Sequence, residues 1–200
     1  MVKQKLKAIF GILVWALLLN SEAKAQTVDF LQVPGPVKFR GADFHLAWSA
    51  HPSDAYYNQE YVRKGEKVEN FKEMLLLEFL AGNLTPQDAV AQKVQELQGR
   101  KKNDPLVNFE VIESPDGKEL MLDFIISSGA AGNLEIAEWN VYRYKTVQDA
   151  SGKKGVLLLA VSRRAYGKEI TPFLKDLKTS RAGYRNDLIA YTLPEINTGK

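Results

Sequence analysis

The chain has 200 residues, with 27 lysines and arginines against 24 aspartates and glutamates, and it contains no cysteine. The lack of cysteine excludes disulfides, thiolate metal sites and cysteine nucleophiles. Residues 1–25 carry four of the lysines and one of the glutamates, so the other 175 residues hold 23 basic and 23 acidic side chains and a formal net charge of zero. A balanced charge argues against nucleic acid as a partner.

The first segment has the layout of a secretory signal peptide. A basic start at residues 3–7 precedes the uncharged block 8–19, and the small residues Ala23 and Ala25 suit cleavage before Gln26. Twelve apolar residues are too few to cross a bilayer, which takes about 20. We therefore expect a periplasmic or secreted bacterial protein whose mature chain is not stably inserted in a membrane.

The remaining sequence predicts an arm followed by one domain. Residues 26–42 contain the run Pro34-Gly35-Pro36, which prevents a continuous helix or ladder and predicts an extended, loosely held N-terminal arm. Residues 43–196 show no repeat and no linker, so we expect them to form a single α+β domain. A domain of this size buries about 70% of the surface that its unfolded chain exposes.

Three strands are predicted at the start of the domain. Residues 43–49 alternate, with Phe44, Leu46 and Trp48 on one face, as a half-buried strand does. Residues 55–64 are rich in tyrosine and predict a second strand. Residues 71–80 fit either a helix or a buried strand, and the run of large apolar residues favours the strand.

A helix is predicted to begin at Thr85. The Thr85 side chain can accept from the free amides of the first turn, Pro86 needs no donor there, and Asp88 suits the positive end of the helix dipole. Gly99 is expected to end this helix. The stripe facing the core consists of Val90, Val94 and Leu97.

Two hairpins and a second helix complete the domain. The hairpins span residues 107–126 and 134–164, and the second helix is expected to start at Thr171 as the first did at Thr85. Because strands come in groups, we expect an antiparallel sheet of about six to seven strands with two main helices packed on it. The apolar face of the second helix holds Phe173, Leu177, Tyr184 and Leu188.

The order of these elements over about residues 43–194 resembles that of the Mog1/PsbP-like α+β domains. Exported bacterial and thylakoid members of that group pack helices on an antiparallel sheet. The resemblance implies an accessory or binding function rather than catalysis, and it transfers no functional residues to this chain.

Both histidines lie in one short pattern, Asp-x-His-x5-His-x2-Asp, formed by Asp43, His45, His51 and Asp54. Four nitrogen and oxygen donors within twelve residues suggest a divalent metal site and hence a metal-dependent hydrolase, although the spacing matches no standard ligand pattern. The alternative places His45 on the solvent side of its strand and His51 in a turn. No Gly-x-Ser-x-Gly turn or phosphate-binding loop is present, and no cofactor is predicted.

Tyrosine and tryptophan are the most distinctive residues of the mature domain. Their amphipathic rings suit ligand or partner surfaces, and the candidates for binding are Trp139, Tyr142, Tyr144 and Tyr57. The leading hypothesis is therefore an exported, non-catalytic domain. It would bind an envelope protein or a small apolar ligand on its sheet or in a groove between sheet and helices.

Overall fold

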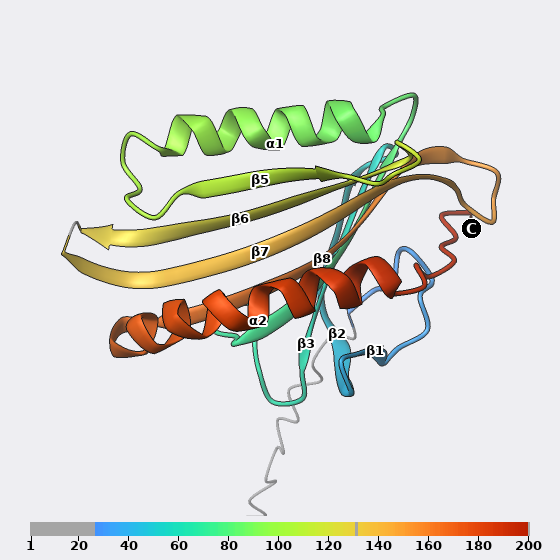
Figure 1. Cartoon of the computed structure of the whole chain (residues 1–200). Helices are drawn as coiled ribbons and strands as arrows, with labels where there is room; N and C mark the ends of the chain where they lie inside the picture. Colours follow the sequence, from blue (N-terminus) through green and yellow to red (C-terminus); the bar gives the residue numbers. More distant parts are fainter. Residues whose placement is uncertain (1–26, 131, 200) are drawn as a thin grey trace, which may run out of the picture.

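The computed structural model describes residues 27–130 and 132–199, which form one antiparallel sheet with a helix on each face (Figure 1). The predicted α+β class is confirmed, although the sheet has eight strands rather than six or seven. The helices are α1 (Pro86–Arg100) and α2 (Ile170–Ala190). The strands are β1 (Val37–Phe39), β2 (Ala42–Ser53), β3 (Tyr56–Arg63), β4 (Glu73–Ala81), β5 (Asn108–Glu113), β6 (Glu119–Ala130), β7 (Asn133–Gln148) and β8 (Lys154–Tyr166).

The sheet joins two antiparallel meanders. Its strand order is β1-β2-β3-β4-β8-β7-β6-β5, so β4 and β8 pair at the centre, from Glu73 opposite Arg163 to Ala81 opposite Gly155. Position 155 requires glycine, because a Cβ there would clash with the carbonyl oxygen of Leu80. Helix α1 connects the first meander to the second.

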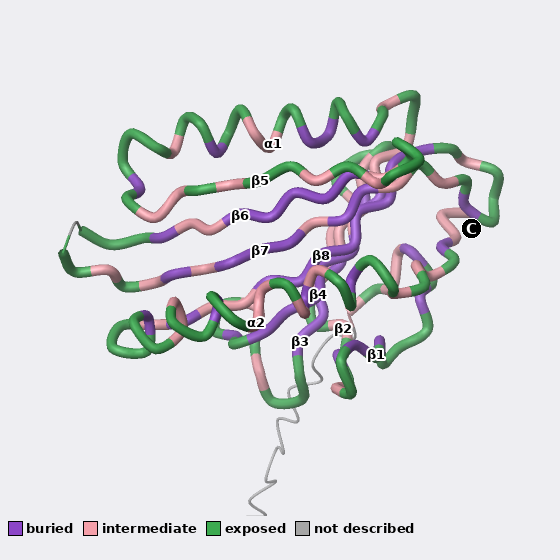
Figure 2. Tube along the Cα trace, in the orientation of Figure 1, coloured by how far each residue is buried: buried purple, intermediate pink, exposed green. Residues whose placement is uncertain are grey.

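The two helices cover opposite faces of this sheet. Val90 and Leu97 of α1 pack with Leu122 of β6 on one face, whereas Leu177 and Leu188 of α2 pack with Trp139 of β7 on the other. Strand β8 has core on both sides, and every residue from 155 to 162 is buried (Figure 2). A strand buried on both faces reads as a continuous apolar run instead of an alternating one.

Strand β4 confirms the prediction of a strand over residues 71–80. The prediction that Phe44, Leu46 and Trp48 share one face of β2 is wrong for Trp48. Phe44 is buried, but a bulge between Leu46 and Trp48 turns Trp48 to the opposite face, where 42% of its surface is exposed. A bulge adds one residue to one strand and so shifts the alternation of side chains.

The start of α1 is as the sequence predicts. The Thr85 hydroxyl accepts from the Asp88 amide at 3.2 Å, and the Asp88 carboxylate accepts from the Thr85 amide at 3.0 Å. This reciprocal capping box satisfies two amide donors at the helix start. The helix continues one residue past Gly99, to Arg100.

The predicted cap of α2 at Thr171 is wrong. The helix begins at Ile170, directly after a 3-10 turn over Gly167–Glu169, and its N-cap is Glu169, which makes no side-chain cap bond. The expected apolar face is present, since Leu177, Tyr184 and Leu188 are buried and Phe173 is half-buried.

The prediction of a loosely held arm is wrong from Leu31 onward. Leu31 and Val33 are buried, and the Leu31 amide donates to Gln59 Oε1 of β3 at 2.8 Å. On its other side the carbonyl of Leu31 accepts from the amide of Asn197, at 2.9 Å. Strand β1, which the sequence also did not predict, then adds this segment to the edge of the sheet.

The predicted signal peptide lies outside the described residues. Within residues 27–130 and 132–199, neither helix has the length and apolar character needed to cross a membrane.

If the arm is part of the core, Leu31→Ala should lower the free energy of unfolding by about 2–5 kcal/mol, as truncation of a buried leucine does. Urea denaturation followed by circular dichroism measures this change. The control is Val28→Ala in the same segment, because Val28 is 56% exposed and its truncation should change stability by less than about 0.5 kcal/mol. Equal effects of the two substitutions would contradict the packing of the arm.

Candidate functional site: a cleft beside helix α1

The structure does not assemble the metal site that the sequence suggested. Asp43 pairs with Lys38 across β1 and β2 at 2.7 Å, His45 is exposed on β2, and Asp54 is exposed in the turn between β2 and β3. In the part of the chain that the structure describes, no three histidine, aspartate or glutamate side chains converge in a way that could hold a metal ion.

The fourth member of that pattern, His51, has a packing role. Its ring stacks on Tyr57 with centroids 4.0 Å apart and an interplanar angle of 12°. Its Nδ1 lies 3.1 Å from the carbonyl oxygen of Tyr56. His51 therefore covers one end of the β2–β3 hairpin.

The four predicted binding residues divide between the two faces of the sheet. Trp139 and Tyr57 are buried on the α2 face, where the Trp139 indole donates to Asp123 at 2.6 Å. Tyr142 and Tyr144 lie on the α1 face and line a cleft of about 370 Å³. The structure thus brings two of the four candidates together at one site.

This cleft lies where the cover of α1 over the sheet ends. Helix α1 packs on β5, β6 and β7, while the cleft floor extends past β7 to Leu158 of β8, Glu78 of β4 and Tyr56 of β3. The register places Tyr144 opposite Leu158, and Leu158 opposite Glu78. The wall is one stripe of α1 at helical spacing, formed by Ala89, Gln92, Lys93 and Glu96.

A chain of hydrogen bonds leads to the cleft floor from Asn58, which lies opposite Glu78 in the sheet but does not line the cleft. Asn58 Nδ2 donates to the Tyr56 hydroxyl at 3.3 Å, and that hydroxyl donates to Glu78 Oε1 at 3.0 Å. The other polar atom of Asn58, Oδ1, is buried, and none of the described residues donates to it. Buried acceptors in proteins nearly always have a donor, so we expect water to bind this atom.

Glu78 is the most perturbed acid of the cleft. Burial raises the pKa of its carboxyl, and the bond from Tyr56 and the charge of Lys93 offset only part of that rise. The pKa of Tyr56 is raised to about 12, first by burial and then by the charge of Glu78. Burial also raises the pKa values of Tyr142 and Tyr144, and Glu78 adds to both shifts.

The one cation of the cleft wall is already paired. Lys93 Nζ lies 3.1 and 2.9 Å from the two carboxylate oxygens of Glu96. Among residues 27–130 and 132–199, no lysine, arginine or histidine forms an ion pair with Glu78. The cleft therefore keeps an unneutralised carboxyl in a partly desolvated place.

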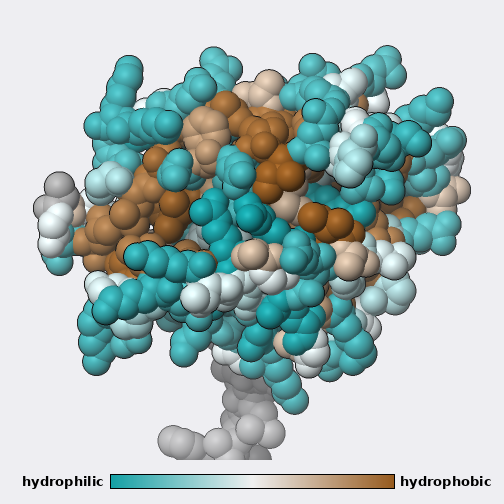
Figure 3. All heavy atoms as spheres, in the orientation of Figure 1, coloured by the Kyte–Doolittle hydropathy of each residue, from teal (hydrophilic) through white to brown (hydrophobic). Residues whose placement is uncertain are grey.

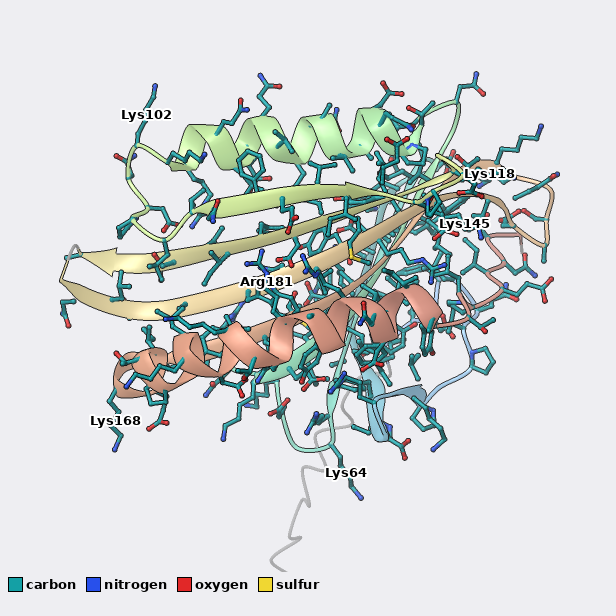
Figure 4. All side chains as sticks on the ribbon, in the orientation of Figure 1. Lys64, Lys102, Lys118, Lys145, Lys168 and Arg181 are labelled. Atoms are coloured by element: carbon teal, nitrogen blue, oxygen red, sulfur yellow. The ribbon has the colours of Figure 1, made fainter. Side chains whose placement is uncertain are left out.

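On the α2 face, the buried carboxylate of Asp123 is satisfied within the protein. Asp123 is fully buried, but it accepts from Trp139 and also from Arg181 Nε of α2 at 2.7 Å. Arg181 reaches from the helix over the sheet (Figure 4). Glu78 differs from Asp123 because no arginine or lysine among the described residues pairs with it, whereas Asp123 binds α2 to the sheet through Arg181.

Two other cavities are weaker candidates. One of about 610 Å³ separates residues 32–38 from the tail at 194–197, and it is formed by the two ends of the described chain. The other, of about 240 Å³, is apolar and lies between the β5–β6 hairpin and Ile189 of α2, where hydrophobic atoms reach the surface (Figure 3). Its one cationic lining residue, Arg143, already donates to Glu119 and to two backbone carbonyls.

Sequence reasoning missed Glu78, Tyr56 and Lys93. Two signals were present in the sequence. Glu78 interrupts a run of apolar residues, and residues 89, 92, 93 and 96 follow helical spacing next to the apolar stripe of the same helix. Nothing in the sequence, however, shows which strands lie under that stripe.

The raised pKa of Glu78 predicts a specific dependence of stability on pH. Between the ordinary pKa of a glutamate and the higher folded value, the folded state binds more protons, so stability falls as pH rises through that window. Glu78→Gln removes this loss. The free energy of unfolding of the variant minus that of the natural protein should therefore be larger at pH 7 than at about pH 4.

Urea denaturation at both pH values measures this change. The matched control is Glu113→Gln, an exposed glutamate at the end of β5, which tests for a general effect of removing one negative charge. A Glu78→Gln variant that loses stability at pH 7 relative to low pH would contradict the desolvation of this carboxyl.

Comparison of the chain with curated proteins and with solved structures finds no match. A protein-family model, described simply as a family, matches residues 31–193, a range that contains all eight strands and both helices. This match covers most of the chain, so the protein belongs to the family that the model describes.

Proposed function

We propose that this protein is an exported, non-catalytic binding domain whose ligand lies in the cleft between α1 and the sheet. The cleft volume of about 370 Å³ falls within the range of small-molecule sites. Its walls combine aromatic rings with a few convergent polar groups, which is the usual composition of such sites.

One observation carries this proposal: Glu78 lies on the cleft floor with the Tyr56 hydroxyl as its one hydrogen-bond donor among the described residues. It forms no ion pair with any of those residues. Unsatisfied buried polar groups cost stability, so a folded protein gains when a ligand completes them.

These polar groups modify the ligand expected from the sequence. A purely apolar ligand would leave the Glu78 carboxylate with the Tyr56 hydroxyl alone, whereas a ligand with both polar and apolar parts would bind it and contact the rings of Tyr142 and Tyr144. The signal-peptide pattern in residues 1–25 supports export. The resemblance to the Mog1/PsbP-like domains, which implies binding rather than catalysis, stays a prediction from the sequence, because no solved structure matches the chain.

A blocking variant tests the location of the site. Gln92 lies on the cleft wall and is exposed, so Gln92→Trp should fill the cleft without removing a core residue. The matched control is Gln95→Trp, the same substitution on the same helix at an exposed position that does not line the cleft.

Ligand-observed NMR with a library of small polar and aromatic fragments provides the measurement. We expect fragments that bind the natural protein to bind Gln95→Trp equally and to lose binding to Gln92→Trp. Fragments that bind all three proteins alike, or a library from which none binds the natural protein, would overturn the proposed site.

A further inference from the structure

We propose that the ligand of this cleft carries an N–H-bearing organic cation, an aliphatic ammonium or guanidinium group, which lies against Glu78 beside the rings of Tyr56, Tyr142 and Tyr144. This inference rests on the proposed function and specifies the chemical class of its ligand.

The charges around the cleft are the first step. From α1 come Lys93 and Glu96, which neutralise each other, and from β4 comes Glu78. Glu60 of β3 points to the same face of the sheet but lies outside the cleft lining, and the charge of Arg164 offsets part of the rise that burial causes in its pKa. The cleft therefore has an excess of negative charge.

The hydrogen-bonding groups give the second step. The acceptor on the floor is the Glu78 carboxylate: its Oε1 accepts from the Tyr56 hydroxyl, and its Oε2 accepts from none of the described residues. A ligand that binds Oε2 must donate. An ammonium or guanidinium group offers several N–H donors together with a positive charge, and hydrogen bonds between charged groups are stronger than neutral ones.

The aromatic rings give the third step. Tyr142 and Tyr144 have ring centroids 6.3 Å apart and planes inclined by 51°, so two ring systems border the same space. A cation near such rings is attracted by their negative faces. The ammonium of Lys93 lies 6.0 Å from the Tyr142 ring centroid, so a cation is already accommodated beside this ring.

A neutral polar ligand fits these observations less well. A sugar could donate hydrogen bonds to Glu78, but it would leave the charge of Glu78 uncompensated in a partly desolvated place. An anionic ligand would add a like charge beside Glu78 and Glu96. Of these three ligand classes, only the cation both neutralises the charge of Glu78 and donates hydrogen bonds to it.

The test uses n-butylammonium chloride as the probe and n-butanol as its neutral isostere, titrated into the isotope-labelled protein and followed by amide NMR shifts. We expect n-butylammonium to shift the amides of cleft residues and n-butanol to leave them unchanged. Glu78→Gln should weaken n-butylammonium binding by about tenfold, as the loss of a charged hydrogen bond does. Glu113→Gln, which removes one exposed acid, should retain the affinity.

A second variant and a second probe complete the design. Tyr142→Leu keeps Glu78 and should weaken binding several-fold through loss of the ring face, which keeps the test valid even if Glu78→Gln does not fold. A capped Gly-Lys-Gly peptide presents the same ammonium on a protein chain. Tighter binding of the peptide than of n-butylammonium would identify a protein side chain as the natural source, and the reverse order would identify a free amine.

The outcomes separate the two proposals. Equal binding of n-butanol and n-butylammonium in the cleft, or n-butylammonium binding that is unchanged in both Glu78→Gln and Tyr142→Leu, would overturn the cation inference while the cleft remains a binding site. If neither n-butylammonium, nor the peptide, nor any library fragment perturbs the cleft amides, the proposed function fails as well.

Discussion

The antiparallel pairing of β4 with β8 is the interaction on which the rest of the structure depends. It joins two meanders into one sheet and places the most buried strand at the centre. Helix α1 spans about 22 Å at 1.5 Å per residue, and it packs over β5, β6 and β7. On the same face of the sheet, α1 therefore leaves β4 and β3 uncovered, and the cleft lies between the helix and these two strands.

The chemistry of the cleft follows from this incomplete cover. Two other buried acids are satisfied by the protein's own donors: Asp123 accepts from Trp139 and Arg181, and Asp104 accepts from the amide and hydroxyl of Ser127. Glu78 lies at the helix edge and has only the Tyr56 hydroxyl. Proteins violate local rules of this kind most often at functional sites, where a ligand supplies the missing partner.

Local signals in the sequence predicted the local structure. The cap at Thr85 and the alternation of β7, which separates Trp139 from Tyr142 and Tyr144, could be read directly, because both depend on neighbours a few residues away. The pairing of β4 with β8 joins residues about 80 positions apart, and the bulge that exposes Trp48 breaks the alternation itself. The site was hidden for the same reason, since its residues come from five separate elements.

The most direct test of this account is the titration of the Glu78 carboxyl by carbon-13 NMR in the folded protein. A desolvated carboxyl without an ion pair should titrate at a pH clearly above the ordinary value for glutamate. A midpoint at or below that value would show that Glu78 is solvated or already paired, and the cleft would then offer no unneutralised acid to a ligand.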